Sequence, residues 1–472
     1  MKKVRVRFAP SPTGDIHIGN ARTALFNYLY AKNSNGTFVL RIEDTDRKRS
    51  EKVYEESIIS DLKWLGIEYD EGPDKNGGFG PYNQFERLQI YDEFKEKLIK
   101  KGFIYKCFCQ PEFLEKIKKE QIKRKEPPRY PGICSNLTEK EIDEKEKSGI
   151  KPVYRFKVGK GKIEYNDMVY GKISFLAQNF GDFIVIRSDG IPAYNFAAVI
   201  DDALMKISHV IRGEDHISNT PLQILLGKAI GFDVPQFAHF PLLLGEDRAP
   251  LSKRVGSVSI KAFRQSGILP EALVHYMVFL GASIIKDEIL PFAQIVKRFS
   301  FDKISRKGAA FDFVKLSWFN KQSLKRMNEK EIANNLTTFI EQKYLNSRYL
   351  LKAIEHGKKQ AENLVELAEI ISPFIKDSFT TQEKIILNEN EKIVLEEFYK
   401  IIENSKAEEE INYPNVLKEV SNNTHLRGRE LYHPIRLALT GMEKGFEMES
   451  VFSILPLDEI KKRLKAALNK VG

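Results

Sequence analysis

The first forty residues alternate between apolar and polar positions in a way that predicts three elements. In Lys3–Ala9 apolar side chains alternate with basic ones, which is typical of a strand. Apolar residues then recur at helical spacing from Ile18 to the turn residues 33–36, and Thr37–Ile42 forms a second apolar strand. A strand, a helix and a strand within about 40 residues predict a βαβ unit of a parallel, doubly wound sheet. Ligands of such sheets bind beyond the carboxyl ends of the strands.

The pattern continues with an amphipathic helix over Tyr54–Leu65 and then changes. Residues 107–152 are rich in lysine and glutamate, and strand-like runs such as VYRFKV and DFIVIRSDG follow them. We interpret this region as an inserted α+β module. The α/β pattern resumes near Ala193.

Three further elements are predicted after the module. HVIRG is a strand, and FPLLLG is another short strand. Between them NTPLQILLGKAIG is a helix, with Thr220 as the expected N-cap, Pro221 in the first turn and Gly231 as the terminator.

From about residue 325 the pattern is almost wholly helical, and strand signals nearly vanish. The pattern therefore predicts an α/β domain with a parallel, doubly wound sheet, an inserted α+β module and an all-α C-terminal region. The expected parts are a first α/β half (1–105), the inserted module (106–192), a second α/β half (193–255), a further segment (256–325) and the helical region (326–472).

Composition narrows the class of protein. The 472 residues carry a formal net charge of +10, which suits a protein that meets a polyanion, although a basic enzyme without such a partner fits equally well. No run reaches the ~20 apolar residues of a membrane span, and no apolar stretch follows the basic N-terminus as in a signal peptide. Three cysteines in so long a chain indicate a reducing compartment, so we expect a cytoplasmic protein without a membrane partner.

The loop RFAPSPTGDIHIGN joins the first strand to the first helix. A helix N-terminus attracts phosphate, but neither glycine-rich phosphate-binding motif is present. Gly14 and Gly19 instead allow a flat ring or a sugar to approach the backbone, and His17 lies where its ring can reach a phosphate. Taken alone, His17 would more often be a structural residue of a tight connection.

The string PSPTGDIHIGN resembles the "HIGH" signature of class I aminoacyl-tRNA synthetases, with Asn20 at the fourth position. LRIEDTD, WLGIEYDEGP, GPYNQFERLQIY, HVIRGEDHISNTP and LSKR resemble glutamyl-tRNA synthetases, in the order of that family over the first 260 or so residues. GRELYHPIRLALTG resembles the bacterial branch, whose anticodon-binding part is helical.

The resemblance implies that 1–105 and 193–255 form a Rossmann-like catalytic domain and that 106–192 binds the acceptor stem of tRNA. It further implies that 256–325 contacts the stem, that 326–472 binds the anticodon, and that the reaction has two steps. Glutamate attacks the α-phosphate of ATP to give glutamyl-adenylate and pyrophosphate, and a ribose hydroxyl of the terminal adenosine of tRNA-Glu then takes the glutamyl group. Mg²⁺ is expected with ATP, since it neutralises phosphate charge. The resemblance also implies that activation requires bound tRNA, and that the protein is a monomer.

The resemblance assigns His17, Gly19 and Lys253 as catalytic positions. The expected ATP site consists of Pro10, Ser11, Thr13, His17, Gly19, Asn20, Ser252, Lys253 and Arg254. Without the other motifs Lys253 would be a solvated surface lysine. One departure is clear: Pro250 replaces the first lysine of the family's KMSKS loop, so its phosphate contact is lost or moves to Arg248 or Arg254.

The amino-acid site needs cations for the side-chain carboxylate of glutamate and an anion for its ammonium group. Arg7 and Arg212 lie at the ends of two strands, and a guanidinium can bind a carboxylate with two hydrogen bonds. The resemblance places the glutamate site at Arg7, Ser11, Glu43, Tyr194 and Arg212.

All three cysteines fall within the inserted module. Cys107, Cys109 and Cys134 suit zinc, which binds four nitrogen or sulfur ligands. The fourth ligand is not obvious, and Tyr130 and Asn136 occupy positions where zinc-bearing relatives place one. Three reduced, metal-free cysteines are the alternative.

Some alternatives stay open at this point. The basic run Lys116–Lys125 is either a solvated helix face or a contact for the acceptor stem of tRNA. The sequence does not exclude a non-discriminating enzyme that also charges tRNA-Gln. The long helical region argues against a short relative that modifies a tRNA base, and His17, Gly19 and Lys253 argue against a non-catalytic tRNA-binding paralogue.

Overall fold

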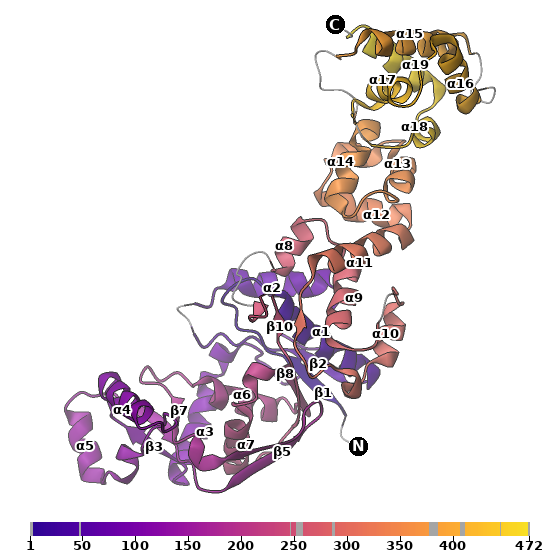
Figure 1. Ribbon diagram of the computed structural model, residues 1–472. Helices are drawn as coiled ribbons and strands as arrows, with labels where there is room; N and C mark the ends of the chain where they lie inside the picture. Colours follow the sequence, from indigo (N-terminus) through magenta and orange to yellow (C-terminus); the bar gives the residue numbers. More distant parts are fainter. Residues whose placement is uncertain are drawn as a thin grey trace. The chain divides into compact units, whose positions relative to one another are not determined.

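The structure is a computed structural model that describes the chain apart from residues 1–2, 47–48, 246, 252–257, 286–287, 377–385, 406–410, 444 and 471–472 (Figure 1). It divides into two compact units. The first consists of Met1–Phe263 with Val274–Asp312, and the second of Arg264–Leu273 with Phe313–Gly472.

The first unit begins with the predicted βαβ arrangement. Strand β1 (Arg5–Phe8) pairs in parallel with β2 (Thr37–Leu40), and helix α1 (Ile18–Asn33) connects them (Figure 1). All four residues of β2 are buried, as expected for a parallel strand covered on both faces. The helix α2 (Lys52–Trp64) follows close to its predicted bounds.

A second parallel pair lies beside the first. Strand β8 (His209–Gly213) pairs with β9 (Gln236–Phe240). The backbone nitrogen of Ser208 donates to the carbonyl oxygen of Arg5 over 2.9 Å, which attaches β8 to β1. The carboxyl ends of β1 and β8 therefore meet at one edge, and the prediction of a parallel α/β sheet is confirmed.

The inserted module contains two antiparallel arrangements. Strands β3 (Ile104–Cys107), β4 (Val153–Phe156) and β7 (Phe183–Ile186) form one sheet. Strands β5 (Lys162–Asp167) and β6 (Gly171–Leu176) form a hairpin, and β5 also pairs with β9 at Asp167. The hairpin thus brings the module to the edge of the catalytic sheet.

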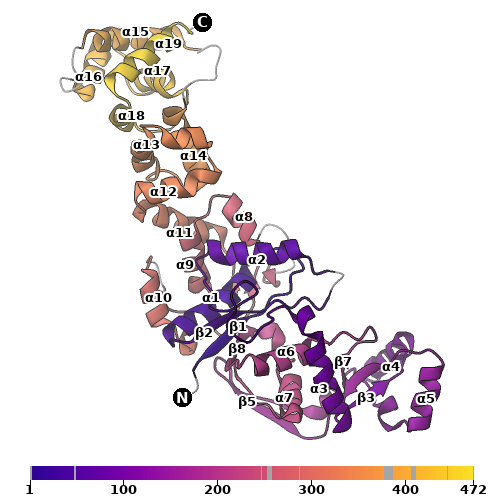
Figure 2. The same ribbon diagram turned by 180° about the vertical axis from the view of Figure 1, so that it is seen from behind.

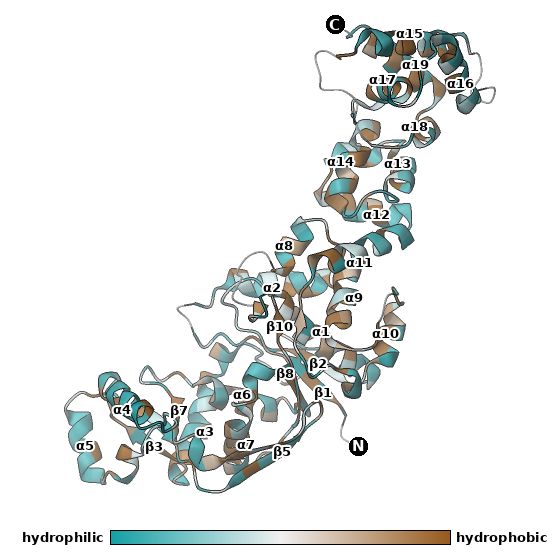
Figure 3. Ribbon diagram, in the orientation of Figure 1, coloured by the Kyte–Doolittle hydropathy of each residue, from teal (hydrophilic) through white to brown (hydrophobic). Residues whose placement is uncertain are grey.

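The module also carries helices α4 (Pro111–Lys123) and α5 (Glu139–Lys147). Both helices are largely hydrophilic in Figure 3, and α5 has no buried residue. They therefore add surface rather than core.

Helices α3 (Leu88–Lys100), α6 (Tyr194–Leu204) and α7 (Thr220–Ile230) pack together, as the rear view in Figure 2 shows. Their apolar side chains share one buried cluster with side chains of β3, β4 and β7. The inserted module and the catalytic domain therefore have a common core.

One detail of α7 differs from the prediction. The helix begins at Thr220, so Asn219 is its N-cap, and the Thr220 hydroxyl instead accepts a hydrogen bond from Arg212. The predicted terminator is confirmed, because Gly231 adopts the left-handed conformation (φ 87°) that favours glycine.

Between β9 and Phe313 the chain forms β10 (Leu243–Leu244), α8 (Ile260–Gln265), α9 (Pro270–Gly281), α10 (Phe292–Arg298) and β11 (Ala309–Ala310). The end of α8 and the start of α9 fall within the second unit.

The described residues of the second unit form helices and loops but no strand, as predicted. Its helices are α11 (Phe313–Arg326), α12 (Glu329–Asn335), α13 (Leu350–Gly357), α14 (Leu364–Ile375), α15 (Glu389–Asn404), α16 (Tyr413–Thr424), α17 (Arg429–Thr440), α18 (Met448–Ile454) and α19 (Leu457–Leu468). The helices α15, α17 and α19 pack against one another around buried apolar side chains such as Phe398, Ile435 and Leu464.

Candidate active site

A cavity of about 720 Å³ opens at the carboxyl ends of β1 and β8. The loop after β1, the first turn of α1 and the loops after β8 and β9 form its walls. It gathers all ten described residues that were predicted for the ATP and glutamate sites, namely Arg7, Pro10, Ser11, Thr13, His17, Gly19, Asn20, Glu43, Tyr194 and Arg212.

The LSKR loop is only partly described. Ser252, Lys253 and Arg254 lie outside the described residues, so their predicted contacts with ATP stay predictions. Pro250 and Leu251, directly before them, line the cavity.

His17 caps helix α1 with its own ring. Its Nδ1 accepts hydrogen bonds from the backbone nitrogens of Gly19 (3.1 Å) and Asn20 (3.3 Å). Burial lowers the pKa of His17, while Asp215 opposes this effect. A neutral ring that accepts at Nδ1 carries its proton on Nε2, and such an N–H can donate to an oxygen anion in the cavity.

The ring of His17 also explains the glycine two residues later. A Cβ atom at Gly19 would lie 2.9 Å from Cε1 and 3.0 Å from Nδ1 of His17. Any larger residue would therefore push the ring out of its capping position. The structure therefore gives a steric reason for a glycine two residues after His17.

Arg212 is a buried cation that has only neutral partners among the described residues. Its Nε donates to His239 Nε2 (3.2 Å), its Nη1 to the Tyr194 hydroxyl (3.3 Å), and its Nη2 to Thr220 Oγ1 and Gln223 Oε1 (both 2.9 Å). Burial lowers the pKa of Arg212. A buried positive charge without a carboxylate is costly, and an acidic ligand in the cavity would compensate it.

Arg7, the second predicted guanidinium, is already paired. Its Nε donates to Asp202 Oδ1 over 3.1 Å, and Arg41 donates to the same oxygen over 2.6 Å. Arg41 also donates to Glu43 Oε1 over 3.1 Å. Three of the described arginines line the cavity, and they differ in their hydrogen-bond partners. Arg7 donates to a carboxylate, whereas the hydrogen bonds of Arg22 and Arg212 within the described part of the chain go to neutral groups only. Asp202 acts on Arg212 at longer range.

Glu43 is 8% exposed and lines the cavity. Burial raises its pKa, and Arg41 and Arg7 counter that rise in part. A ligand ammonium group beside this carboxylate would favour its charged form, as any nearby cation does.

The prediction from sequence missed several residues of the site. Asp202 forms an ion pair with Arg7, and Arg41 forms one with Glu43. Asp215 and His216 line the cavity. Arg41, Asp215 and His216 lie within the quoted motifs LRIEDTD and HVIRGEDHISNTP, which was a usable signal. Nothing in the local pattern marks Asp202, because its partners Arg7 and Arg41 are far away in the sequence.

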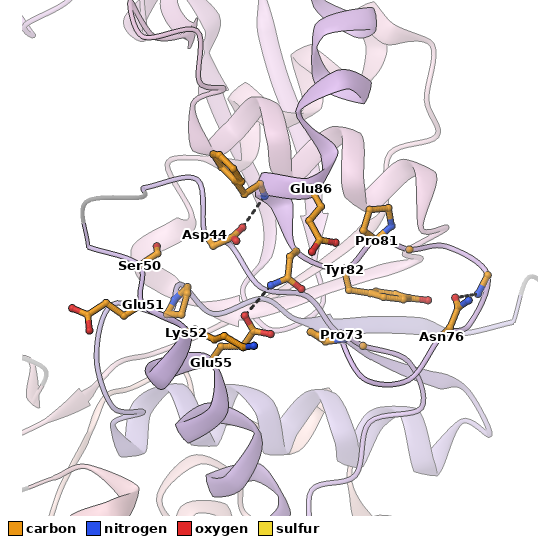
Figure 4. Close-up of a pocket in the computed structure, with 16 residues that line it drawn as sticks. Asp44, Ser50, Glu51, Lys52, Glu55, Pro73, Asn76, Pro81, Tyr82 and Glu86 are labelled. Atoms are coloured by element: carbon orange, nitrogen blue, oxygen red, sulfur yellow. Dashed lines mark hydrogen bonds between the residues drawn. The ribbon is translucent and has the colours of Figure 1, made fainter.

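A second cavity, of about 740 Å³, lies next to the first, beyond Pro12 and Asp44 (Figure 4). Two of the four acidic residues that line it accept hydrogen bonds from the protein. Asp44 accepts from the backbone nitrogen of Phe85 and Glu55 from the Asn83 amide, both over 2.8 Å. None of the described residues predicted for ATP or glutamate lines it, so the cavity at β1 and β8 remains the candidate active site.

The three cysteines of the module meet in space. The sulfur atoms of Cys107, Cys109 and Cys134 lie within 4.8 Å of one another, and those of Cys109 and Cys134 are 3.6 Å apart. Tetrahedral zinc with ~2.3 Å bonds to sulfur needs sulfurs about 3.8 Å apart. The Tyr130 hydroxyl lies 3.4 Å from Cys107 Sγ and 3.5 Å from Cys109 Sγ, whereas no such contact of Asn136 is seen among the described residues.

The pKa values of two of the thiols shift in opposite directions. Burial raises the pKa of Cys107, but hydrogen bonds from Tyr130, the Cys109 backbone and Arg155 outweigh burial and lower it. Burial and the neighbouring Cys107 and Cys134 raise the pKa of Cys109 to about 12, although Tyr130 acts in the opposite direction. The three sulfurs and their spacing fit a structural zinc ion, and the Tyr130 hydroxyl lies close enough to two of them to be a candidate fourth ligand.

The basic run of α4 is exposed to solvent over nearly its whole length. Lys118 lies 3.6 Å from Glu115, and Arg124 lies 3.5 Å from Glu126. These pairs engage part of the charge, so both interpretations of the run stay predictions.

Among the described residues, the helices are too short or too polar to cross a membrane.

Comparison with known proteins agrees with this geometry. Residues 3–318 match the family model "tRNA synthetases class I (E and Q), catalytic domain", and residues 331–468 match "Anticodon binding domain". The chain is 43% identical over its full length to glutamate–tRNA ligase 2 of Syntrophus aciditrophicus, covering 99% of that protein. It is also 43% identical to glutamate–tRNA ligase of Sulfurihydrogenibium sp., with 99% of this chain and 100% of the relative covered.

A solved structure of a glutamate tRNA ligase from Elizabethkingia meningosepticum in complex with its amino acid superposes with a TM-score of 0.83, at 31% identity over 100% of both chains. The Rossmann-like fold and the helical anticodon-binding region are thereby confirmed. The chain therefore belongs to the class I tRNA synthetases for glutamate and glutamine and, within them, to the glutamate–tRNA ligases.

Proposed function

We propose that this chain activates L-glutamate with ATP and transfers it to tRNA-Glu. The glutamate α-carboxylate attacks the α-phosphate of ATP, and pyrophosphate leaves to give glutamyl-adenylate. A ribose hydroxyl of the 3′-terminal adenosine then attacks the glutamyl carbonyl, and AMP leaves. Both nucleophiles belong to substrates, so the protein contributes position and charge.

The observation that carries this proposal is the unbalanced charge of Arg212 in the cavity that also contains His17. Arg212 would bind the side-chain carboxylate of glutamate with help from Arg7 and Tyr194, and Glu43 would hold the ammonium group. Glutamine has no charge to offer, so it would leave Arg212 buried and uncompensated.

ATP would occupy the side of the cavity at the start of α1. His17 would donate from Nε2 to a phosphate oxygen, next to the positive end of the helix. Pro10, Ser11, Thr13, Gly19 and Asn20 would surround the nucleotide, and Ser252, Lys253 and Arg254 would close over its phosphates. Mg²⁺ would accompany ATP and neutralise phosphate charge. We expect Lys253→Ala to abolish pyrophosphate exchange while tRNA binding persists.

The other parts of the chain would serve the tRNA. The match of 331–468 to an anticodon-binding domain supports anticodon recognition by the helical region 326–472. Residues 106–192 would bind the acceptor stem, with zinc held by Cys107, Cys109, Cys134 and Tyr130 as a structural ion. Residues 1–105 and 193–255 would form the catalytic domain and 256–325 a stem contact. The chain would act as a monomer in the cytoplasm.

The test is aminoacylation by the purified chain, with tRNA-Glu and tRNA-Gln each offered glutamate and glutamine. The proposal expects glutamate on tRNA-Glu and glutamine on neither tRNA. Glutamate on both tRNAs would identify a non-discriminating enzyme, and no charging of tRNA-Glu would refute the proposal.

A further inference from the structure

Behind Arg212 lies a buried chain of side chains that the proposed reaction does not use. His239 is fully buried on β9, and Asp167 is 1% exposed at the end of β5. His239 Nδ1 lies 2.7 Å from Asp167 Oδ2, and His239 Nε2 lies 3.2 Å from Arg212 Nε. The three residues come from β5, β8 and β9, and the first belongs to the inserted module.

The distances fix where the proton of His239 lies. Asp167 is a carboxylate that accepts from the backbone nitrogens of Val169 (2.9 Å), Tyr170 (3.0 Å) and His239 (3.2 Å). Its 2.7 Å contact with His239 Nδ1 therefore needs the proton on that nitrogen. Arg212 always donates, so the nitrogen facing it, Nε2, must be the bare acceptor. The Thr220 hydroxyl lies 3.1 Å from the same nitrogen and can donate to it as well.

The environment keeps His239 in this neutral form. Burial lowers the pKa of His239, and the positive charges of Arg212 and Arg7 lower it further, against the hydrogen bond and the charge of Asp167. A protonated ring would face the Arg212 Nε–H group with a second N–H group, and neither could bond the other.

We propose that Asp167 and His239 are positioning residues for glutamate recognition. Asp167 keeps His239 in the tautomer that accepts a hydrogen bond from Arg212. This hydrogen bond fixes the position of the guanidinium group without neutralising its charge. This inference rests on the proposed function of Arg212. Gln223 shares the same task, since its amide is oriented by Asn195 and its oxygen accepts from Arg212. Neutral acceptors hold the side chain without cancelling the charge that an acidic substrate requires.

The isosteric change Asp167→Asn reverses the tautomer. Oδ1 of Asp167 accepts from the backbone at Val169 and Tyr170, so the amide oxygen of asparagine takes that place. Its NH₂ group then faces His239 Nδ1 and must donate to it. The proton of His239 moves to Nε2, where it opposes Arg212 Nε–H. Thr220 Oγ1 can accept that proton, but Arg212 Nε still loses its acceptor. We expect the glutamate KM to rise about tenfold to a hundredfold, because a buried donor loses its acceptor, while the ATP KM changes less than about twofold.

His239→Gln separates this effect from general damage to the fold. The glutamine side chain offers an acceptor near the position of Nε2 and has no tautomers. We expect its glutamate KM to stay within about threefold of the parent value. In the His239→Gln background, Asp167→Asn should add no further rise. A purely structural role of Asp167 would instead raise the KM equally in both backgrounds.

The direct readout is the ¹⁵N NMR spectrum of the histidine rings, with the His239 signals assigned by their loss in His239→Gln. We expect the proton on Nδ1 in the parent chain and on Nε2 in Asp167→Asn. Asp182→Asn is a matched control, because Asp182 accepts from Tyr105 (2.6 Å) and the Val158 backbone (2.7 Å) in the same module. It should leave both the His239 tautomer and the glutamate KM unchanged.

The outcomes separate this inference from the proposed function. A parent enzyme that charges tRNA-Glu, together with an unchanged glutamate KM in Asp167→Asn, would overturn the inference alone. A His239 proton on Nε2 in the parent chain would also overturn it. A parent chain that does not charge tRNA-Glu would refute the proposed function, while the NMR comparison would still report on the tautomer.

Discussion

Replacement of Arg212 by glutamine tests the origin of amino-acid selectivity. Arg212 is 4% exposed and makes four hydrogen bonds, all to neutral groups among the described residues. A carboxylate about 4 Å away, at an effective dielectric constant near 20, gains about 4 kcal/mol from the guanidinium charge. A charge-assisted hydrogen bond alone is worth about 1.5–3 kcal/mol. We therefore expect kcat/KM for glutamate to fall by about two to three powers of ten.

The same change should not harm the fold. Burial lowers the pKa of Arg212, which means that the folded protein disfavours its charged form. Glutamine removes that charge and can still bond Thr220 or His239, so we expect Tm to stay or to rise. Arg463→Gln is the contrasting control. This buried arginine of the second unit pairs with Glu459 over 2.9 Å and donates to the backbone carbonyls of Pro373 and Leu439. Its loss should lower Tm and leave substrate kinetics normal.

The assay is aminoacylation of tRNA-Glu with glutamate and ATP varied separately, together with a thermal melt. The ATP KM should change less than about threefold in Arg212→Gln. Equal rises of both KM values, or a loss of Tm with unchanged glutamate kinetics, would refute the reasoning from unbalanced charge.

Three other changes probe separate parts of the molecule. Gly19→Ala should displace the His17 ring and cost about 1 kcal/mol of helix capping. The ATP KM should then rise at least about tenfold. An unchanged ATP KM would contradict this steric argument. Burial and Arg212 lower the pKa of His216 to about 4, so the unfolded chain binds an extra proton as pH falls from 6.5 toward 4. The free energy of unfolding, measured by chemical denaturation, should therefore fall more steeply over that window in the parent chain than in His216→Gln. Parallel curves for the two chains would contradict this expectation. Cys134→Ser should lower the zinc content measured by atomic emission, and a metal-free parent chain would remove the zinc proposal.

The sequence pattern was sufficient for the elements that carry the site. Alternation and helical spacing located β1, α1 and β2 within two residues of their observed bounds, because burial on both faces leaves a strong apolar signal. Motif resemblance located the cavity residues, and all ten described ones line one cavity.

What the pattern did not reveal depends on contacts between distant segments. Asp202 lies 195 residues from Arg7, and Asp167 lies 72 residues from His239, so neither pair leaves a local spacing to detect. At Thr220 the local pattern gave a wrong prediction. The neighbouring residues predict that Thr220 is an N-cap, but its hydroxyl accepts a hydrogen bond from Arg212 instead. Tertiary hydrogen bonds outweighed the local preference there.

A crystal structure of the chain with a non-hydrolysable glutamyl-adenylate analogue tests the central claim most directly. The account predicts the side-chain carboxylate of the analogue against Arg212, its ammonium group beside Glu43, and its phosphate-mimicking group within reach of His17 Nε2. An analogue bound in the neighbouring cavity at Asp44 and Tyr82, or bound with its carboxylate away from Arg212, would contradict it.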